Sequence, residues 1–495
     1  MLEREFKLVP PKDFSLINFS GPLPEGWRFG DWQQSLQESV YWDTVDLALT
    51  RAGLSLRYRE GEGWVVKLPR SWRGELVGRT EVVVAGEPER VPGKVMELLR
   101  AHLRFERILP VLRLEATRTK RTIEDAEGTV RALLVLDTVA AAEGSAEHFR
   151  ELELELMPEM KEEKATALLV HLESLGVRRS DGIAKHVRAL GARALVPLPW
   201  VIDQVKPGGT LAELVASTLS RSVQQLLHHD PRVFVGDDAE DVHQARVAVR
   251  RLRSDLQTFD VVLGKMPIAQ LLDDLQPLAQ ALGALRDLDV LMGRLQGHLD
   301  ALPTGLRDHA DELQRRIERE RERAREVLLE LRSGAAFAVT LERLLREVPL
   351  LLHIPELQQP AEAAVGKVLE RAWQPLREMV RRLPKQPRDN QLHRVRILAK
   401  RCRYAVEALT PLLPASANDF AHDVARLQTV LGDYHDAVVA QRYWERLARD
   451  GHKGMKALLE ELRKQDHAQE SALRVRWRGQ WETLEGHPFL AEGAL

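Results

Sequence analysis

The sequence HQARVAVRRLR, from His243 to Arg253, recurs in pattern about 150 residues later as HRVRILAKRCR, from His393 to Arg403. In each segment, cationic residues follow the leading histidine at offsets of three, seven and ten, which is the spacing of one face of an α-helix. Like charges at this spacing repel each other and destabilise an isolated helix. Two such segments indicate helices whose charge is balanced by a polyanion.

The candidate polyanion contacts are the basic and imidazole side chains of these segments, with a flanking arginine at offset eight in each: His243, Arg246, Arg250, Arg251, Arg253, His393, Arg396, Lys400, Arg401 and Arg403. A second pair of motifs, LGALRD at Leu282–Asp287 and LGDYHD at Leu431–Asp436, shows nearly the same lag. Two markers in the same order at one lag indicate an internal duplication. We therefore expect an all-α domain of two pseudo-symmetric helical bundles.

The composition sets limits on the class of protein. Lys and Arg number 72 and Asp and Glu number 74, so the total charge indicates no particular partner. The single cysteine, Cys402, excludes an intrachain disulfide. The N-terminal sequence lacks the apolar stretch of a signal peptide, and no run approaches the roughly 18 apolar residues of a membrane helix. From the 495 residues we expect a soluble cytoplasmic protein of two to four domains, without a membrane partner.

The pattern of the chain changes at its middle. Residues 1–190 contain short runs of alternating polar and apolar residues, such as FRELELEL at Phe149–Leu156, and this alternation is typical of β-strands. Residues 191–209 are rich in Pro and Gly and are expected to form a linker. Residues 210–490 have helical periodicity throughout. The sequence therefore predicts a β domain followed by an α domain.

Charged residues recur at alternate positions of the expected strands. The first strand reads E-x-E-x-K from Glu3 to Lys7, and a late strand reads ELELE from Glu151 to Glu155. An ordinary half-exposed sheet also carries charge on one face. Repetition of both signs across several strands favours the shared interior of a closed barrel instead. Glutamates that repel each other there would suit Mg²⁺ or Mn²⁺, and neighbouring Arg and Lys would suit phosphate oxygens.

The E-x-E-x-K motif resembles the signature of CYTH domains, the triphosphate tunnel metalloenzymes. Other motifs similar to that family are YWDT at Tyr41–Thr44, LSLRYR at Leu54–Arg59, WVVK at Trp64–Lys67, Arg79 with Glu81, and the late ELELE strand. The resemblance covers residues 1–190. It implies an eight-stranded antiparallel β tunnel that hydrolyses or transforms triphosphate compounds with a divalent metal ion.

The resemblance also implies roles for single residues by position. The implied metal ligands are Glu3, Glu5, Glu151 and Glu153, with Glu155 belonging to that set or supporting it. The implied triphosphate contacts are Lys7, Arg57, Arg59, Lys67, Arg79 and Arg118. Arg118 differs in strand parity from Arg113 and Glu115, so we expect a bulge or a register change between them. No residue is assigned as a general base.

The helical half resembles the CHAD domain, a conserved-histidine α-helical module that binds inorganic polyphosphate. The two basic segments and the two Leu-Gly motifs carry this resemblance, which covers residues 210–490. CYTH and CHAD domains are known to occur fused in bacterial proteins, so each resemblance supports the other. We expect His243 and His393 to donate hydrogen bonds to phosphate, more strongly when protonated.

The chain departs from the CYTH pattern at three places. Leu133 and Leu134 stand where relatives often carry a carboxylate. Ala184 stands where relatives have a serine before the lysine at Lys185, and Glu115 lies in a strand that tends to be basic. These departures leave the fold expectation intact and bear on the activity.

Two functions follow from the sequence. The first is a metal-dependent inorganic triphosphatase that hydrolyses tripolyphosphate and has an accessory polyphosphate-binding domain. The second is a non-catalytic or weakly catalytic polyphosphate-binding protein located on polyphosphate granules. Adenylate cyclase and thiamine-triphosphatase activities also occur among CYTH proteins. Nucleic acid is the least favoured partner, because no aromatic platform interleaves with the basic segments.

Overall fold

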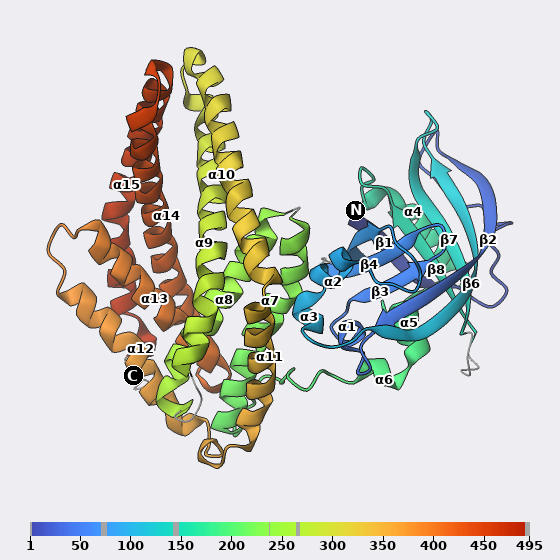
Figure 1. Ribbon diagram of the computed structural model, residues 1–495, viewed down its shortest axis with the longest axis horizontal. Coiled ribbons are helices and arrows are strands. Elements are labelled where there is room, and N and C mark those ends of the chain that lie inside the picture. Colours follow the sequence, from blue (N-terminus) through green and yellow to red (C-terminus); the bar gives the residue numbers. More distant parts are fainter. Residues whose placement is uncertain (1, 71–76, 142–147, 237, 264–267, 491–495) are drawn as a thin grey trace. The chain divides into compact units, whose positions relative to one another are not determined.

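The computed structural model describes residues 2–70, 77–141, 148–236, 238–263 and 268–490 of the chain. The chain divides into two compact units, Met1–Leu198 and Pro199–Leu495 (Figure 1). The N-terminal unit is built mainly from strands and the C-terminal unit from helices. No helix in the described ranges is both long enough and apolar enough to cross a membrane.

The N-terminal unit is a closed antiparallel barrel, as predicted. Its strands are β1 (Leu2–Val9), β2 (Arg28–Asp43), β3 (Ser55–Arg59), β4 (Gly63–Arg70), β5 (Val77–Val84), β6 (Leu109–Glu124), β7 (Val130–Ala141), β8 (Phe149–Leu156) and β9 (Arg178–Arg179). They pair in the order β5-β4-β3-β2-β6-β7-β8-β1-β9, and an additional β5–β1 pairing closes eight of them into the barrel. The two-residue strand β9 pairs with the end of β1.

Leucines and glutamates alternate along β8, so the strand has one apolar face and one charged face. Leu152, Leu154 and Leu156 are buried in an apolar cluster with Leu168 and Leu172 of helix α4 (Glu163–Ser174). The glutamates between these leucines lie on the other face of the strand, because successive side chains of a strand point to opposite faces. The apolar core of this unit therefore lies outside the barrel wall, and the barrel interior remains polar.

The expected bulge between Glu115 and Arg118 is wrong. Strand β6 pairs with β2 without a register shift over this stretch, with Glu38 opposite Glu115 and Ser35 opposite Arg118. The register shifts lie near the two ends of this pairing instead. Simple alternation therefore places Arg118 on the inner face, whereas Arg113 is exposed on the outer face with Glu115.

Short helices complete the N-terminal unit, and long helices form the second unit. The short helices are α1 (Ala48–Arg51), α2 (Gly93–Leu98), α3 (Arg100–Leu103), α5 (Lys185–Leu190) and α6 (Ala192–Leu195). The long helices are α7 (Leu211–Val235), α8 (Ala239–Leu263), α9 (Ile268–His298), α10 (Arg307–Ser333), α11 (Ala335–Leu350), α12 (Glu362–Arg381), α13 (Asp389–Leu409), α14 (Ser416–Asp450) and α15 (Lys453–Glu485).

The helical unit repeats one arrangement of four helices. The basic segments lie on α8 and α13, and the Leu-Gly motifs lie on α9 and α14. The order α7–α10 thus recurs as α12–α15, in agreement with the predicted duplication. Figure 1 shows α9 with α10, and α14 with α15, as two long hairpins. A buried apolar cluster that includes Leu295, Leu313, Trp444 and Leu458 joins these hairpins.

A buried carboxylate also joins the two hairpins. The side chain of Asp466 on α15 is fully buried and accepts hydrogen bonds from Arg294 Nε (3.0 Å) and from Trp444 Nε1 (2.7 Å). His298 Nε2 lies 3.0 Å from Asp466 Oδ1. Burial alone would raise the pKa of Asp466, but the hydrogen bond with His298 and the charge of Arg294 lower it. The carboxylate is therefore held as the anion that these donors require.

Replacing this carboxylate should destabilise the helical unit strongly. We expect Asp466→Ala to lower the free energy of unfolding by about 3 kcal/mol, because it leaves Arg294 and Trp444 without their buried acceptor. Urea unfolding followed by circular dichroism measures the change. The control is Glu461→Ala on the same helix, which removes an ion pair with Lys464 made by more exposed side chains and should change stability by less than about 0.5 kcal/mol. Equal unfolding midpoints for the two variants would contradict the assignment.

Candidate functional site

The barrel interior holds a cavity of about 220 Å³ that is lined mostly by charged side chains. Its lining residues are Glu3, Glu5, Lys7, Tyr41, Ser55, Arg57, Arg59, Glu62, Lys67, Arg79, Glu81, Arg118, Glu153, Glu155, Ala184, Lys185 and His186. All six predicted triphosphate contacts and four of the five predicted metal ligands are in this set. Glu151 does not line the cavity; it is buried and accepts a hydrogen bond from Lys7 Nζ at 2.8 Å.

Three glutamates form an acidic cluster in the cavity. One carboxylate oxygen from each of Glu3, Glu5 and Glu155 lies within 4.8 Å of the others. Burial, followed by repulsion from Glu153, raises the pKa of Glu5 and of Glu155 to about 7 in each case. A divalent cation would remove this repulsion, and three carboxylates are the oxygen ligands that Mg²⁺ and Mn²⁺ prefer. The donor set therefore fits the metal that the sequence predicts, with Glu3, Glu5 and Glu155 in the cluster and the other two predicted ligands, Glu151 and Glu153, outside it.

Glu153 has a different role from the glutamates of the cluster. Its Oε1 accepts hydrogen bonds from Lys7 Nζ at 2.8 Å and from Lys185 Nζ at 3.1 Å. Burial alone would raise the pKa of Glu153, but Lys185 and Lys7 lower it well below its usual range. Burial alone would lower the pKa of Lys7, but Glu153 and Glu5 raise it well above its usual range. Glu153 thus holds two ammonium groups at the cavity wall.

A second carboxylate positions Arg118 and Lys185. Arg118 donates two hydrogen bonds to Asp137, of 2.9 and 2.7 Å, and Lys185 also pairs with Asp137. Burial alone would lower the pKa of Arg118, but its hydrogen bonds to Asp137 raise it, so the guanidinium stays charged. Relatives have a serine where this chain has Ala184, but the lysine that follows, Lys185, is part of the cavity and keeps its ammonium group there.

The remaining cations line the wall formed by β3, β4 and β5. Lys67 Nζ donates to both carboxylate oxygens of Glu3 at 2.7 Å. Arg57 pairs with Glu62 at 3.2 Å, and Arg59 pairs with Glu62 at 3.1 Å. Arg59 also donates to Ser39 Oγ at 3.0 Å. Each of these cations has neighbouring acceptors, so a bound phosphate chain would compete with protein carboxylates for them.

His186 is a cavity residue that the sequence reasoning missed. Its ring stacks on Tyr41 with the ring centroids 5.0 Å apart. Burial, followed by the charge of Arg79, lowers the pKa of His186 to about 3, so the imidazole is neutral. Its buried Nε2 has no hydrogen-bond partner in the structure. The only sequence signal was its position directly after Lys185.

The helical unit contains a second charged pocket, of about 340 Å³. Its lining residues are His243, Arg246, Arg250, Arg286, Asp287, Val290, Leu291, His393, Arg396, Lys400, Gln428, Thr429, Gly432, Asp433, His435, Asp436 and Val439. These come from α8, α9, α13 and α14, which carry the duplicated motifs. The residues at offsets zero, three and seven of both basic segments therefore face one shared space, as the duplication suggested.

The glycines of the Leu-Gly motifs lie beside equivalent arginines. A Cβ placed on Gly283 would lie 3.7 Å from Arg246 Nε, and one on Gly432 would lie 3.8 Å from Arg396 Nε. A methyl group would touch the guanidinium at these distances, and any longer side chain would displace it. The motifs thus leave room for the arginine that the facing helix presents.

The cations of this pocket are incompletely balanced. The ion pair of Arg246 with Asp287 spans 3.6 Å, and the buried Nε atoms of Arg250 and Arg396 have no hydrogen-bond partner in the structure. Burial, followed by the charges of Arg250 and Arg396, lowers the pKa of Lys400 to about 6. A polyanion in the pocket would supply the missing acceptors and raise the pKa of this lysine.

The two leading histidines have lowered pKa values in the structure, which favours their neutral forms. Burial, followed by the charge of Arg286 for His243 and of Arg396 for His393, lowers the pKa of each. The Nδ1 atoms of His393 and His435 lie 3.2 Å apart, so that one nitrogen donates to the other. Burial, followed by Arg396, lowers the pKa of His435 to about 3.

Four of the predicted polyanion contacts lie outside this pocket. Arg251 and Arg403 both pair with Glu407, at 2.9 and 3.4 Å, and both guanidinium groups lie over the ring of Tyr404. Arg253 donates to the carbonyl of Leu272, and Arg401 is also absent from the pocket lining. An offset of eight turns a side chain by about 80° in the sense opposite to offsets three and seven, and an offset of ten turns it further than either.

Arg286 and His435 complete the pocket and were missed as contacts. Both stand one residue before the aspartate that ends the duplicated motif, at Asp287 and Asp436. Their equivalent positions in the two motifs were the available signal. Their chemistry differs, one being a guanidinium and the other a neutral imidazole, and this difference hid the equivalence.

Comparisons with known proteins match both units. Residues 1–185 match the CYTH domain and residues 217–445 match the CHAD domain. Two curated relatives, uncharacterized proteins MT2285 and Rv2226 of Mycobacterium tuberculosis strains CDC 1551 and H37Rv, are each 30% identical over 441 residues, or 82% of this chain and 81% of theirs. A crystal structure of the CHAD domain from the plant Ricinus communis is 28% identical, with a TM-score of 0.49, and covers 59% of this chain and 97% of its own.

The barrel and its charged interior thus define a CYTH domain, and the duplicated helices define a CHAD domain. The chain belongs to the proteins that join these two domains.

The acidic cluster should make the stability of the metal-free barrel depend on pH. A carboxyl group whose pKa is raised from about 4.5 in the unfolded chain to about 7 in the folded chain does not destabilise the fold below pH 4.5. Above pH 7 it lowers the free energy of unfolding by its full amount. We therefore expect Glu155→Gln to stabilise the protein relative to the unsubstituted chain increasingly between about pH 5 and about pH 8, by on the order of 2 kcal/mol. Denaturant unfolding across this range in a chelator measures the difference.

The matched control for this experiment is Glu163→Gln, which removes one negative charge from an exposed position on α4. Glu155→Gln and Glu163→Gln should diverge as the pH rises. Parallel stability profiles would show that Glu155 does not experience the repulsion of the cluster.

Proposed function

We propose that the CYTH domain is a metal-dependent triphosphatase that hydrolyses inorganic tripolyphosphate. The observation that carries this proposal is the division of charge in the cavity. Glu3, Glu5 and Glu155 gather within ligand distance of one another, and six predicted phosphate contacts share the same cavity. Attack by water on a terminal phosphorus breaks one phosphoanhydride bond and yields orthophosphate and diphosphate.

The three clustered glutamates would hold Mg²⁺ or Mn²⁺. When bound, such an ion neutralises phosphate oxygens and lowers the pKa of a bound water. The chain's own residues supply the positioning on which phosphoryl transfer mainly depends. Arg118 is held by Asp137, and Lys7 and Lys185 are held by Glu153, so these cations have fixed positions before substrate arrives.

Substrate binding must exchange protein acceptors for phosphate oxygens. Lys67 now pairs with Glu3, and Arg57 and Arg59 pair with Glu62. Metal binding at Glu3 would weaken its hold on Lys67, because the same carboxylate oxygens would then face the ion. Metal and triphosphate binding should therefore support each other.

We propose that the CHAD pocket binds inorganic polyphosphate. The partly unpaired cations on α8 and α13, with Arg250 and Arg396 each lacking a partner for a buried Nε, support a polyanionic ligand. Charge-assisted hydrogen bonds from arginine to phosphate are strong and directional. In this proposal the protein acts in the cytoplasm, where the helical domain holds polyphosphate while the barrel hydrolyses the shorter chain.

The second candidate is a polyphosphate-binding protein of granules with a weak or inactive barrel. One departure from the CYTH pattern favours it: Leu133 lies directly opposite Glu155 in the β7–β8 pairing, where relatives often carry a carboxylate. The departure at Glu115 counts less, because this residue is exposed on the outer face. The substituted Ala184 also counts less, because Lys185 remains in the cavity.

Hydrolysis should depend on the inner face of β6 and not on its outer face. We expect Arg118→Ala to reduce kcat/KM for tripolyphosphate with Mg²⁺ or Mn²⁺ by about 100-fold or more, because it removes a preorganised cation from the reacting phosphates. Arg113→Ala, on the outer face of the same strand, is the control and should leave kcat/KM unchanged. Phosphate release measures both. Absence of hydrolysis by the unsubstituted protein would select the second candidate.

Polyphosphate binding should depend on position within the basic segments. We expect Arg250→Ala combined with Arg396→Ala to weaken binding, and to reduce the slope of log affinity against log salt by roughly one for each arginine removed. Arg401→Ala, on α13 outside the pocket, is the matched control and should change neither quantity. Titration of polyphosphate at several salt concentrations measures the effect. Equal losses in the double variant and the control would contradict binding in the pocket.

A further inference from the structure

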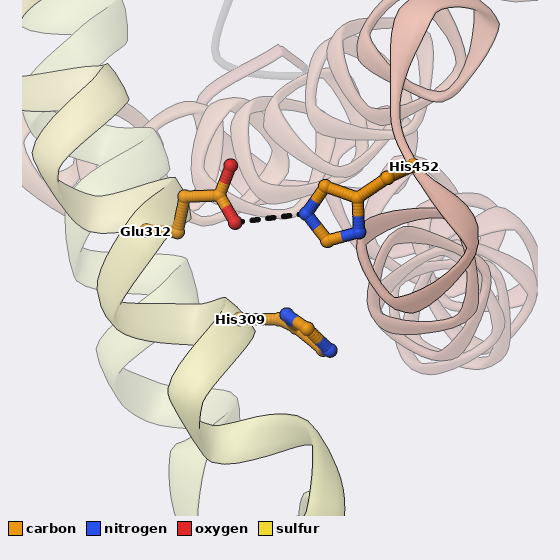
Figure 2. A group of neighbouring side chains, drawn as sticks. All are labelled: His309, Glu312 and His452. Atoms are coloured by element: carbon orange, nitrogen blue, oxygen red, sulfur yellow. Dashed lines mark hydrogen bonds and ion pairs between the residues drawn. The ribbon is translucent and has the colours of Figure 1, made fainter.

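Three side chains that neither proposed site uses converge where the two hairpins of the helical unit meet. His309 and Glu312 lie on the first turns of α10, and His452 directly precedes α15 (Figure 2). One ligand atom from each lies within 4.8 Å of the others. None of the three lines the basic pocket. The group therefore requires an explanation of its own.

The geometry brings two imidazoles and one carboxylate to face each other. His452 Nε2 lies 3.0 Å from Glu312 Oε2, and Figure 2 shows the His309 ring on the same side of α10, pointing toward the ring of His452. The centroids of the two imidazole rings are 5.1 Å apart. Glu312 and His452 are about half exposed, so an ion can reach them from solvent.

A glycine makes room for one of these imidazoles. A Cβ on Gly454, in the first turn of α15, would lie 2.0 Å from His309 Nε2. No side chain fits at that distance, so any substitution would displace the ring of His309. Glycine weakens a helix relative to alanine, and the close approach of His309 gives this position a reason for it.

The backbones that carry the three side chains are fixed by packing. Ala310 and Leu313 on α10 and Met455 and Leu458 on α15 belong to the buried apolar cluster that joins the two hairpins. His452 is further fixed as the N-cap of α15, where its Nδ1 accepts a hydrogen bond from Met455 N at 3.3 Å. The backbone positions that carry the ligand atoms are thus set by packing before any ion binds.

We propose that His309, Glu312 and His452 form a binding site for a divalent transition-metal ion, of which Zn²⁺ fits best. Two imidazole nitrogens and one carboxylate oxygen are a common ligand set for Zn²⁺, with a water molecule in the fourth position. Mg²⁺ prefers oxygen ligands and would bind poorly here. The ion would connect α10 of the first repeat to α15 of the second.

Metal binding would replace two contacts that the structure shows. Coordination by Nε2 of His452 displaces the proton that now faces Glu312. The imidazole must then carry its proton on Nδ1, which ends the cap contact with Met455 N.

The test uses the full-length protein in excess Mg²⁺, so that carboxylate sites in the barrel are already filled. We expect Zn²⁺ to bind this site and to raise the melting temperature, because an ion held by both hairpins stabilises the folded state. His309→Ala and His452→Asn should each abolish this Zn²⁺-dependent shift and lower the Zn²⁺ affinity by at least about tenfold. Asparagine retains the N-cap function at this position, so His452→Asn removes the ligand and keeps the cap.

A control variant and a Co²⁺ spectrum test whether Zn²⁺ binds at this site. The control His353→Ala removes an exposed histidine elsewhere in the helical unit and should keep both the shift and the affinity. Co²⁺ in place of Zn²⁺ should give a visible ligand-field spectrum that both site variants lose. Unchanged Zn²⁺ affinity in both site variants, or equal loss in His353→Ala, would overturn the proposal. Tripolyphosphate hydrolysis and polyphosphate binding should persist in all three variants, so failure here is distinct from failure of the proposed functions.

Discussion

Charges of one sign that are crowded together in a partly buried space cost free energy unless opposite charge meets them, and both domains are organised by this constraint. The barrel meets it internally for three of its cations, because Glu153 and Asp137 hold Lys7, Lys185 and Arg118 in place. The helical pocket meets it only in part, since its aspartates are fewer than its cations. The first arrangement suits a site that positions several groups around a reaction, and the second suits a site that binds a polyanion.

The fold explains why the same residue types behave differently in the two domains. In the barrel, hydrogen-bonded strands bring Lys7 beside Glu151 and Glu153, so this cation has carboxylates on the neighbouring strand. In the helical domain, the basic residues that line the pocket come from both α8 and α13 and share one space. Arg246 and Arg396 therefore face each other across the pocket without carboxylates that fully balance them.

The fold could be predicted because alternation and duplication can be read directly from the sequence, and the resemblance to CYTH domains implied the eight-stranded tunnel. Alternation predicted the strands, and the lag between equivalent motifs predicted the repeated helices. The sites were harder, since they depend on how elements meet. Strand parity alone could not show that Glu155, and not Glu151, joins Glu3 and Glu5. Helix spacing grouped the residues at offsets zero, three, seven and ten on one face, but only those at offsets zero, three and seven line the pocket. Arg251 and Arg403 lie against Tyr404 and Glu407 instead. The cluster of His309, Glu312 and His452 joins positions far apart in sequence, and no local sequence motif predicts it.

The duplication of the pocket has a consequence for directionality. A linear chain of condensed phosphates reads the same from either end, unlike a peptide or a nucleic acid strand. The pocket presents His243 with Arg246 on one side and His393 with Arg396 on the other, so its two halves offer nearly the same groups. A binding site with two similar halves distinguishes poorly between the two directions in which a chain can bind. For a polymer whose two ends are identical, the two directions are equivalent.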